Sequence, residues 1–467
     1  MATALHLPID RTQPRARALG AALREAIRAG RLAVGTQLPP SRALADDLGL
    51  ARATVVEVYA QLQAEGYLVS RRGAGTWVAH VPLAPARAET VRQSQPRFRF
   101  DFNPGVPDLT AFPRAAWTRA LRRGLRQAPA ATLGNGDPAG RAELRSALAA
   151  YLARARGVTA EPSLTMVCAG TNHALALLGR VLHGRGVRRI AMEDPNLPLH
   201  RRVVAATGLD VVPLPVDDYG ARTDLLGELG VGAVVLAPAH QFPLGVQLAP
   251  ERRSAAIAWA RASNGLVIED DYDAELRYDR APIGALQALD PDRVVYVGTA
   301  SKTLAPGLRL GWMIMPPALT EPVAAVRRLD DLQTAATEQI AFSELLRCGD
   351  FERHIRRMRA RYRKRRDRFL AMLAQRAPGA RPAGVSAGLH VRLELPATSP
   401  SSTKIEEHAL TRSVSLFPLL RCYHDVRAPD DLPDGLVLGY AALPEHDFAN
   451  GVDALGDLLE DELAPHR

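Results

Sequence analysis

The run RVVYVGTASKTLAPGLRLGW, residues 293–312, places one lysine between two apolar stretches. The stretch that begins the run and the stretch GWMIMP that overlaps its end are short and rich in bulky apolar residues, as expected of buried strands. Lys302 follows the first stretch after small and hydroxyl-bearing residues. A lysine at a strand end is placed to form a Schiff base with an aldehyde cofactor. Because only three of the 59 basic residues are lysines, chemistry that needs a lysine amine has few candidates.

Similar apolar runs recur upstream of this stretch and alternate with helical patterns. They are LTMVCAG (164–170), RIAMED (189–194), LDVVPLPV (209–216), GAVVLAP (232–238) and GLVIEDD (265–271). This alternation predicts an α/β fold with a mostly parallel sheet that is covered by helices. A helical stretch from about Glu321 to Ala377 precedes a small C-terminal α/β part, which we expect to begin near residue 378.

Polar residues follow several of these strand ends, where ligands bind in such sheets. The Asp270 carboxylate could keep a pyridine nitrogen protonated, and the Tyr272 hydroxyl could bond to a phenolate oxygen. Donors for a phosphate are expected from Gly170, Thr171 and Asn172 at a helix start and from Thr299, Ser301 and Arg309. Singly, such residues are more often surface, loop or capping residues. Their combination predicts a site for pyridoxal 5'-phosphate.

The N-terminal region reads as a separate small unit. Apolar spacing predicts a helix that ends at Gly30, a second helix from Ser41 to Gly49 and a third that ends at Gly66. Two short β runs then flank the basic, glycine-rich segment RRGAG, residues 71–75. This order is the layout of a winged helix-turn-helix. The second helix of its helix-turn-helix pair, here the helix that ends at Gly66, enters the DNA major groove.

Basic and polar residues of this unit are candidates for DNA contacts. We expect them at Arg42, Arg52 and Thr54 on the helices and at Arg71, Arg72 and Gly73 in the wing. Residues 1–79 hold ten arginines and six acidic residues, a net charge of +4. The alternative is a three-helix interaction domain with a solvated basic face. The order, the spacing and the wing favour double-stranded DNA as the partner.

Residues 35–78, GTQLPPSRALADDLGLARATVVEVYAQLQAEGYLVSRRGAGTWV, resemble the N-terminal domain of GntR-type bacterial regulators. DFNPGVPDLTAFPRAAW, VIEDDYDAELRY and VYVGTASKTLAPGLRLGW resemble the type I aminotransferase fold, so the whole chain is similar to MocR-type regulators. The resemblance implies a DNA-binding domain over 1–79, a linker over 80–98 and a pyridoxal-phosphate domain over 99–467. It also implies a head-to-tail homodimer and catalytic roles for Lys302, Asp270 and Tyr272.

Several residues depart from the aminotransferase pattern. Leu197 stands where an aromatic usually stacks on the cofactor, and Asn135 where a tyrosine often reaches the partner subunit's phosphate. Asn172 and His173 replace a glutamine pair, and Val437 replaces the arginine that binds a substrate α-carboxylate. These departures weigh against ordinary amino-acid transamination.

Three functions follow as hypotheses. The first is a transcriptional regulator that binds operator DNA and senses a small ligand, which pyridoxal phosphate itself could be, in its aminotransferase-like domain. The second is an active aminotransferase with a DNA-binding appendage. The third is a regulator whose cofactor site has become purely structural. Retention of Asp270, Tyr272, Lys302 and Arg309 argues against the third.

Composition and charge indicate which partners, metal sites and cellular location to expect. The 467 residues carry a net charge of +9, which permits an anionic partner. Cys168, Cys348 and Cys422 are too far apart in sequence for a CxxC metal site or a disulfide framework, and we expect no metal. The N-terminus lacks a secretory signal and we find no membrane span, so we expect a cytoplasmic protein. The arginine-rich run 352–369 keeps an apolar stripe and reads mainly as a solvated helix face.

Overall fold

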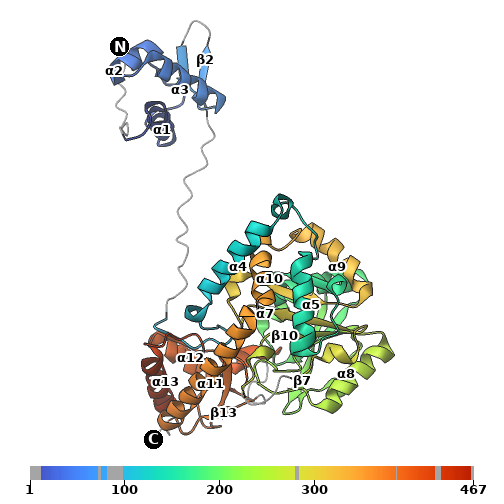
Figure 1. Cartoon of the computed structure of the whole chain (residues 1–467). Helices are drawn as coiled ribbons and strands as arrows, with labels where there is room; N and C mark the ends of the chain where they lie inside the picture. Colours follow the sequence, from blue (N-terminus) through green and yellow to red (C-terminus); the bar gives the residue numbers. More distant parts are fainter. Residues whose placement is uncertain are drawn as a thin grey trace. The chain divides into compact units, whose positions relative to one another are not determined.

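The computed structural model describes residues 12–71, 75–80, 98–278, 283–384, 387–425 and 433–463. The chain divides into two compact units, Met1–Gln95 and Pro96–Arg467 (Figure 1). Residues 81–97, most of the expected linker, lie outside the described residues.

The N-terminal unit has the expected three helices followed by two strands. Its helices are α1 (Arg15–Arg28), α2 (Ser41–Leu48) and α3 (Arg52–Ala64). Strands β2 (Leu68–Arg71) and β3 (Gly75–Val78) pair antiparallel, and β1 (Gln37–Leu38) adds a third strand in the order β1-β3-β2. The prediction of helices and wing is confirmed, whereas β1 was not predicted because two residues carry no periodicity.

Apolar spacing explains why these helices fold together. Leu19, Leu23 and Ile27 of α1 meet Val55 and the other buried residues of α3 in one cluster. At the end of α2, Gly49 adopts the left-handed conformation, with φ 63°. That residue closes α2 and starts the turn into α3, because glycine takes this conformation at no steric cost.

The larger unit is built on an eight-stranded sheet in the order β5-β12-β11-β10-β9-β6-β7-β8. Its strands are β5 (Thr165–Cys168), β6 (Arg189–Asp194), β7 (Asp210–Asp217), β8 (Gly220–Ala221), β9 (Ala233–Leu236), β10 (Leu266–Asp271), β11 (Val294–Thr299) and β12 (Gly311–Ile314). The central strands are parallel, whereas β12 and β8 run antiparallel to their neighbours. All seven predicted strands are confirmed, and two-residue β8 is the one that was not predicted.

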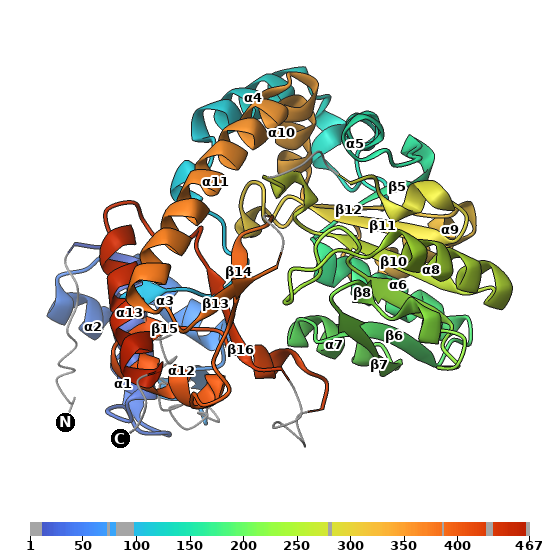
Figure 2. The same ribbon diagram turned by 90° about the horizontal axis from the view of Figure 1, so that it is seen from below.

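Helices cover both faces of this sheet (Figure 2). They are α4 (Arg114–Gln127), α5 (Ala142–Arg156), α6 (Thr171–Gly184), α7 (Pro198–Ala205), α8 (Pro250–Ser263), α9 (Pro317–Asp330), α10 (Ala336–Arg347) and α11 (Asp350–Arg376). On β11, Val295 and Val297 pack with α6 and α9, whereas Val294 and Tyr296 pack on the opposite face. The predicted helical stretch before residue 378 therefore exists, but it is divided into α9, α10 and α11.

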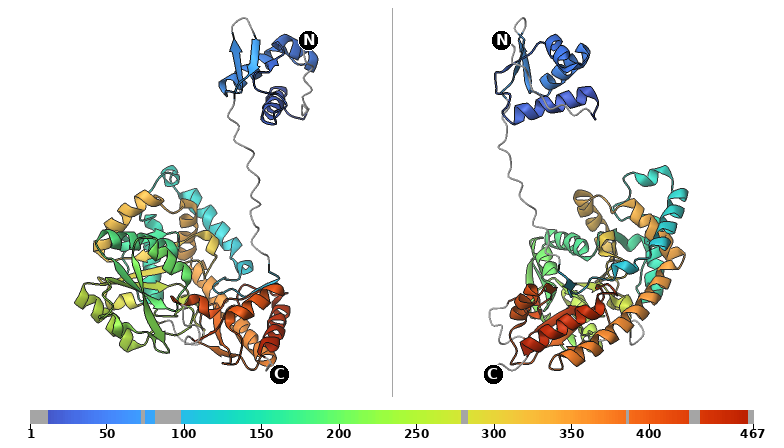
Figure 3. Two further views of the ribbon diagram at one scale, coloured as in Figure 1. Left: turned by 180° about the vertical axis from the view of Figure 1, so that it is seen from behind. Right: turned by 90° about the vertical axis from the view of Figure 1, so that its left-hand side faces the viewer.

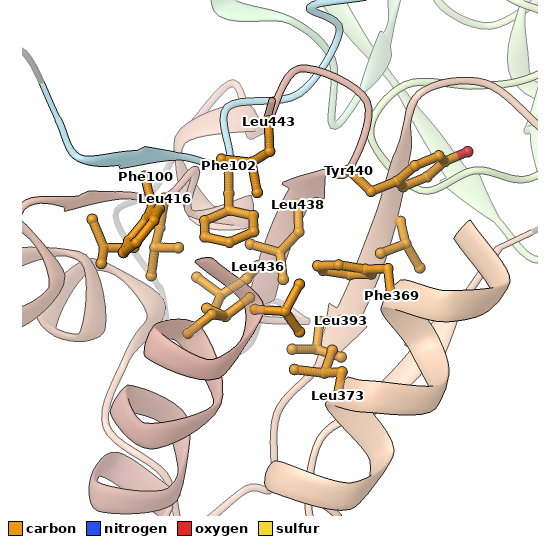
Figure 4. Close-up of a cluster of buried hydrophobic side chains, with 14 of the residues drawn as sticks. Phe100, Phe102, Phe369, Leu373, Leu393, Leu416, Leu436, Leu438, Tyr440 and Leu443 are labelled. Atoms are coloured by element: carbon orange, nitrogen blue, oxygen red, sulfur yellow. The ribbon is translucent and has the colours of Figure 1, made fainter. Parts of the chain in front are cut away.

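A smaller part lies at one end of this unit, where the orange and red elements gather (Figure 3). Its sheet joins β13 (Arg381–Ala383), β14 (His390–Glu394) and β16 (Gly435–Gly439), all antiparallel, next to α12 (Ser402–Thr411), α13 (Phe448–Leu463) and the end of α11. β4 (Phe100–Asp101) pairs with β15 (Val414–Ser415) in this part. Phe100 and Phe102 enter its apolar core (Figure 4). We expected a small part formed by C-terminal residues alone, but residues 100–102 also belong to it.

Candidate functional site

A cavity of about 330 Å³ opens at the carboxyl ends of the central strands of the large sheet. Eight of the predicted cofactor residues line it, namely Thr171, Asn172, Asp270, Tyr272, Thr299, Ser301, Lys302 and Arg309. Gly170 backs the cavity without lining it, since a Cβ there would lie 3.6 Å from an Arg309 guanidinium nitrogen. The structure thus brings together residues that span 139 positions of the sequence.

Lys302 lies in the turn after β11 and points at the N-terminal segment of the larger unit. Its Nζ donates a hydrogen bond of 2.7 Å to the carbonyl oxygen of Gly105. Burial lowers the pKa of this amine, and the nearby Asp273 and Asp270 oppose that effect. A lysine with a lowered pKa has a larger neutral, nucleophilic fraction at physiological pH.

Asp270 lies near the end of β10, on the wall of the same cavity. Burial, reinforced by Asp271 and Asp273, raises the pKa of its carboxyl group to about 7. Its oxygens lie 3.5 Å from Thr171 Oγ1 and 3.8 Å from His200 Nδ1. Because burial disfavours a lone carboxylate here, a cation beside Asp270 would stabilise its ionised form.

The Tyr272 hydroxyl lies 3.2 Å from His240 Nδ1, and the two rings are stacked. Burial raises the pKa of Tyr272 well above its ordinary value, so its hydroxyl remains protonated at neutral pH. His240 is buried and lies 2.9 Å from the Asp273 carboxylate. It does not line the cavity, and its contacts with Asp273 and Tyr272 give it a structural role.

Hydrogen-bond donors gather where α6 begins. Gly170 has φ 102° and immediately precedes the first turn of α6, whose backbone N–H groups favour anions. Thr299 Oγ1 lies 2.9 Å from Ser301 Oγ and would lie 3.8 Å from a Cβ on Gly170. Arg309 has no ion-pair partner within the described part of the chain. This corner therefore suits a phosphate group.

Other cavity residues escaped the sequence analysis. They include Asn103, Gly105, Glu193, Asn196, His200, Asp273 and His390. Glu193 near the end of β6 obeys the strand-end rule that identified Asp270, and burial raises its pKa to about 8. Gly105 and His390 come from outside the large sheet, so no strand-end rule could have found them.

Three of the departures from the aminotransferase pattern occupy different places. Leu197 lines the cavity, whereas Asn135 does not. Val437 is fully buried in an apolar cluster with Leu244 and Leu419. The cavity's lining includes one arginine, Arg309.

Two other arginines lie near this region but are engaged elsewhere. Arg392 faces Val437 across the β14–β16 pair and donates to Glu394 at 2.7 Å. Arg201 donates to backbone carbonyl groups, including that of Tyr423 at 2.9 Å. Neither arginine lines the cavity.

In the N-terminal unit, three of the predicted DNA contacts, Arg42, Arg52 and Arg71, are exposed. Arg42 and Arg52 stand in the first turns of α2 and α3 and are exposed, and Thr54 is half-buried. Arg71 at the end of β2 stacks 5.5 Å from the Trp77 ring. Arg72 and Gly73 lie outside the described residues.

None of the helices in the described ranges has the length and apolarity to cross a membrane. In the same ranges, histidine, cysteine, aspartate and glutamate side chains form no group of three or more that could hold a metal ion.

Comparison with known families matches both units. Residues 15–78 match the bacterial regulatory proteins of the gntR family, and residues 101–427 match the class I and II aminotransferases. The probable rhizopine catabolism regulatory protein MocR of Rhizobium meliloti is 32% identical, with 97% of this chain and 95% of that protein covered. The pyridoxine biosynthesis transcriptional regulator PdxR of Corynebacterium glutamicum is 34% identical, with 79% and 81% covered.

A solved structure agrees with the fold of the larger unit. The kynurenine aminotransferase of Pyrococcus horikoshii, in complex with PMP, is 26% identical with a TM-score of 0.70, and the match covers 79% of this chain and 92% of that one. The predicted fold class and family resemblance are confirmed. The chain belongs to the MocR-type transcriptional regulators, in which a GntR-type winged helix-turn-helix precedes a class I and II aminotransferase domain.

Proposed function

We propose that this regulator holds pyridoxal 5'-phosphate in the cavity and adjusts its binding to operator DNA when the cavity's occupancy changes. Lys302 carries the cofactor, Asp270 pairs with its ring nitrogen and Tyr272 bonds to its phenolate oxygen. Gly170, Thr171, Asn172, Thr299, Ser301 and Arg309 hold its phosphate. The observation that carries the proposal is the convergence of these residues around one cavity.

When bound, pyridoxal phosphate supplies an aldehyde that condenses with amines and a ring that accepts electrons. The chain's residues set the conditions for this. Lys302 has a lowered pKa, so a neutral amine is available to the aldehyde. Burial raises the pKa of Asp270 to about 7, and a cationic ring nitrogen beside it would favour the ionised carboxylate. The protonated Tyr272 donates its hydroxyl hydrogen.

The effector that fits this cavity has no α-carboxylate. An amino acid's carboxylate is normally held bidentately by arginine, and one left unpaired in a partly dry pocket costs several kcal/mol. Arg309 is assigned to the phosphate, and Val437 offers only an apolar side chain. The signal is therefore pyridoxal phosphate itself or an amine without an α-carboxylate, and transaminase turnover is negligible. The relative PdxR is named as a regulator of pyridoxine biosynthesis, which suits the first choice.

The working form is a homodimer that reads two half-sites of an operator. Leu133, Leu329 and Leu332 are exposed apolar residues, and the Gln333 side chain links their two segments through bonds to Gly134 and Gly136. Such a patch suits burial against a second copy. Residues 80–98 serve as the linker between the units, and operator binding places the protein in the cytoplasm.

The second candidate function is an active aminotransferase with a DNA-binding appendage. The likeness to a kynurenine aminotransferase and the presence of Lys302, Asp270 and Tyr272 favour it. The apolar surroundings of Val437 and the presence of Leu197 argue against it.

Operator binding tests the proposal. DNA from the gene's own upstream region is titrated with the apo form, the holo form and the holo form plus a panel of α-amino acids and simple amines. We expect apo and holo forms to differ in affinity, and Lys302→Ala to respond as the apo form does. Equal affinities of apo and holo forms, with one α-amino acid changing affinity or being transaminated, would contradict the proposal.

A further inference from the structure

The positive charge of the chain is concentrated on two helices of the aminotransferase-like unit. Helix α11 contains eleven basic and three acidic residues, a net charge of +8, and α4 contains five arginines and no acidic residue. Together they carry +13, more than the net +9 of the whole chain. The excess charge is therefore not a general property of the surface, and it lies mainly outside the DNA-binding unit.

These two helices line one groove of about 890 Å³, separate from the cofactor cavity. Its arginines are Arg114 and Arg119 on α4 and Arg353, Arg356, Arg357 and Arg361 on α11. Two of these arginines pair with carboxylates, Arg353 with Asp350 and Arg361 with Asp108.

Three of these arginines carry uncompensated charge. Arg119, Arg356 and Arg357 are exposed and make no ion pair or side-chain hydrogen bond with any described residue. Clustered guanidinium groups without counter-ions raise the local positive potential of the groove, which attracts anions. A groove of this kind favours a polyanion over a single small anion.

We propose that this groove binds the sugar-phosphate backbone of the DNA that flanks the operator half-site. Positions 353 to 361 span about 12 Å of helix at 1.5 Å per residue. Over that length a DNA strand presents three to four phosphates, spaced about 3.4 Å along the duplex axis. Contacts from arginine to phosphate carry no sequence information, so the groove adds affinity and not specificity.

The same chain supplies the reason to choose DNA over an acidic protein. Its N-terminal unit belongs to a DNA-binding family, and the covalent link keeps bound DNA at a raised effective concentration near the second unit. This inference uses neither the cofactor nor the effector, so it stands apart from the function proposed above.

The test compares two duplexes, one with the operator alone and one extended by about 20 base pairs on each side. The variant Arg119→Gln, Arg356→Gln, Arg357→Gln is made in the full-length protein. Its matched control is Arg261→Gln, Arg328→Gln, Arg381→Gln, which removes the same charge from exposed positions on α8, α9 and β13. Thermal melting checks that both variants fold, and fluorescence anisotropy measures DNA affinity over a range of salt concentrations.

Wild type and control should bind the extended duplex at least 10-fold more tightly than the short one, and the groove variant should lose this advantage. Each lost phosphate contact should reduce the slope of log affinity against log salt by about 0.9. In wild type, hydroxyl-radical footprints should show protected flanking sugars. Equal binding of the extended duplex by wild type and groove variant would overturn the proposal. So would poly-L-glutamate binding that the groove variant loses while its DNA binding is unchanged, because the groove would then recognise an acidic protein.

Discussion

The Nζ of Lys302 and the carbonyl oxygen of Gly105 lie 2.7 Å apart, although 197 positions separate the two residues in sequence. Gly105 has φ +79°, and a Cβ on it would lie 2.8 Å from the Lys302 nitrogen. Replacing Gly105 would therefore both strain the backbone and displace the lysine.

Gly105→Ala should weaken cofactor binding about 10-fold or more, because the new Cβ would lie 2.8 Å from the Lys302 Nζ and displace the amine that carries the cofactor. The strain of the left-handed conformation, about 1 kcal/mol, should lower the stability of the apo and holo forms alike. Titrating the apoprotein with pyridoxal phosphate and following its visible absorption band measures the effect. Gly227→Ala is the control, since its new Cβ would meet no atom within 4 Å. Equal affinity of Gly105→Ala and wild type would show that the lysine's position does not depend on this contact.

Lys302 should be the residue to which pyridoxal phosphate becomes attached. Borohydride treatment of the holoprotein, followed by mass spectrometry of its peptides, should find the cofactor on Lys302. Lys302→Ala should lose the visible absorption band, whereas Lys404→Ala should keep it. Equal labelling of Lys364 or Lys404 would remove the basis for this assignment.

Asp270 should reduce the stability of the apoprotein as the pH rises. Its folded-state pKa of about 7 lies above the ordinary value of 3.8, so the unfolded chain loses this proton first. The free energy of unfolding should therefore fall between about pH 4 and pH 7 and stay low above that range. Asp270→Asn should stabilise the apoprotein at pH 8 by about 1–3 kcal/mol, with a smaller difference at pH 5.

Urea unfolding at several pH values measures this difference, and Asp292→Asn at an exposed position should leave the profile unchanged. The same Asp270→Asn variant should bind the cofactor more weakly, because it has no charge to pair with the ring nitrogen. A variant that is less stable than wild type at pH 8 would mean that the carboxylate is compensated in the apo form.

Val437→Arg should not restore transamination. The side chain at this position is fully buried among apolar neighbours, and an unpaired guanidinium there costs several kcal/mol. We expect a lower melting temperature and no turnover of α-amino acids, whereas Val437→Ile should melt close to wild type. A stable Val437→Arg variant that transaminates α-amino acids would contradict this prediction, because the valine at this position alone would then account for the lack of turnover.

Arg52→Ala should relax the sequence preference of operator binding, because the start of α3 is where side chains reach base edges. Arg72→Ala should weaken binding to all sequences more evenly, as expected of a phosphate contact. Competition assays against single-base operator variants separate the two effects, with Arg31→Ala as an exposed control. Wild-type behaviour of both variants would place the DNA contacts elsewhere.

Local patterns predicted most of the fold because they reflect burial. The seven longer strands of the large sheet have continuous apolar runs, and the stripe of Ile355, Met358, Tyr362 and Phe369 is buried in α11 as predicted. Two-residue strands such as β1 and β8 have no detectable period. The pairing of β4 with β15 joins segments more than 300 positions apart and depends on tertiary contacts alone.

For the site, the strand-end rule found residues at or just after the ends of β5, β10 and β11. It could not find Gly105 or His390, which reach the cavity from segments outside the large sheet. The arginine-rich sequence of α11 also does not reveal which of its arginines are exposed to solvent and which are buried. Arg365 is buried and donates to the Ala441 carbonyl at 2.7 Å, a role that depends on the folded small part.

The anchoring of Phe100 and Phe102 has a mechanical consequence. These residues pack in the small part, so the chain that arrives from the DNA-binding unit is rooted there and not in the large sheet. Any displacement of the small part against the large sheet carries that root with it by the same distance. Leu389 and His390 of this same part help to line the cavity, so one structural part holds both a wall of the cavity and the point at which the chain enters the larger unit.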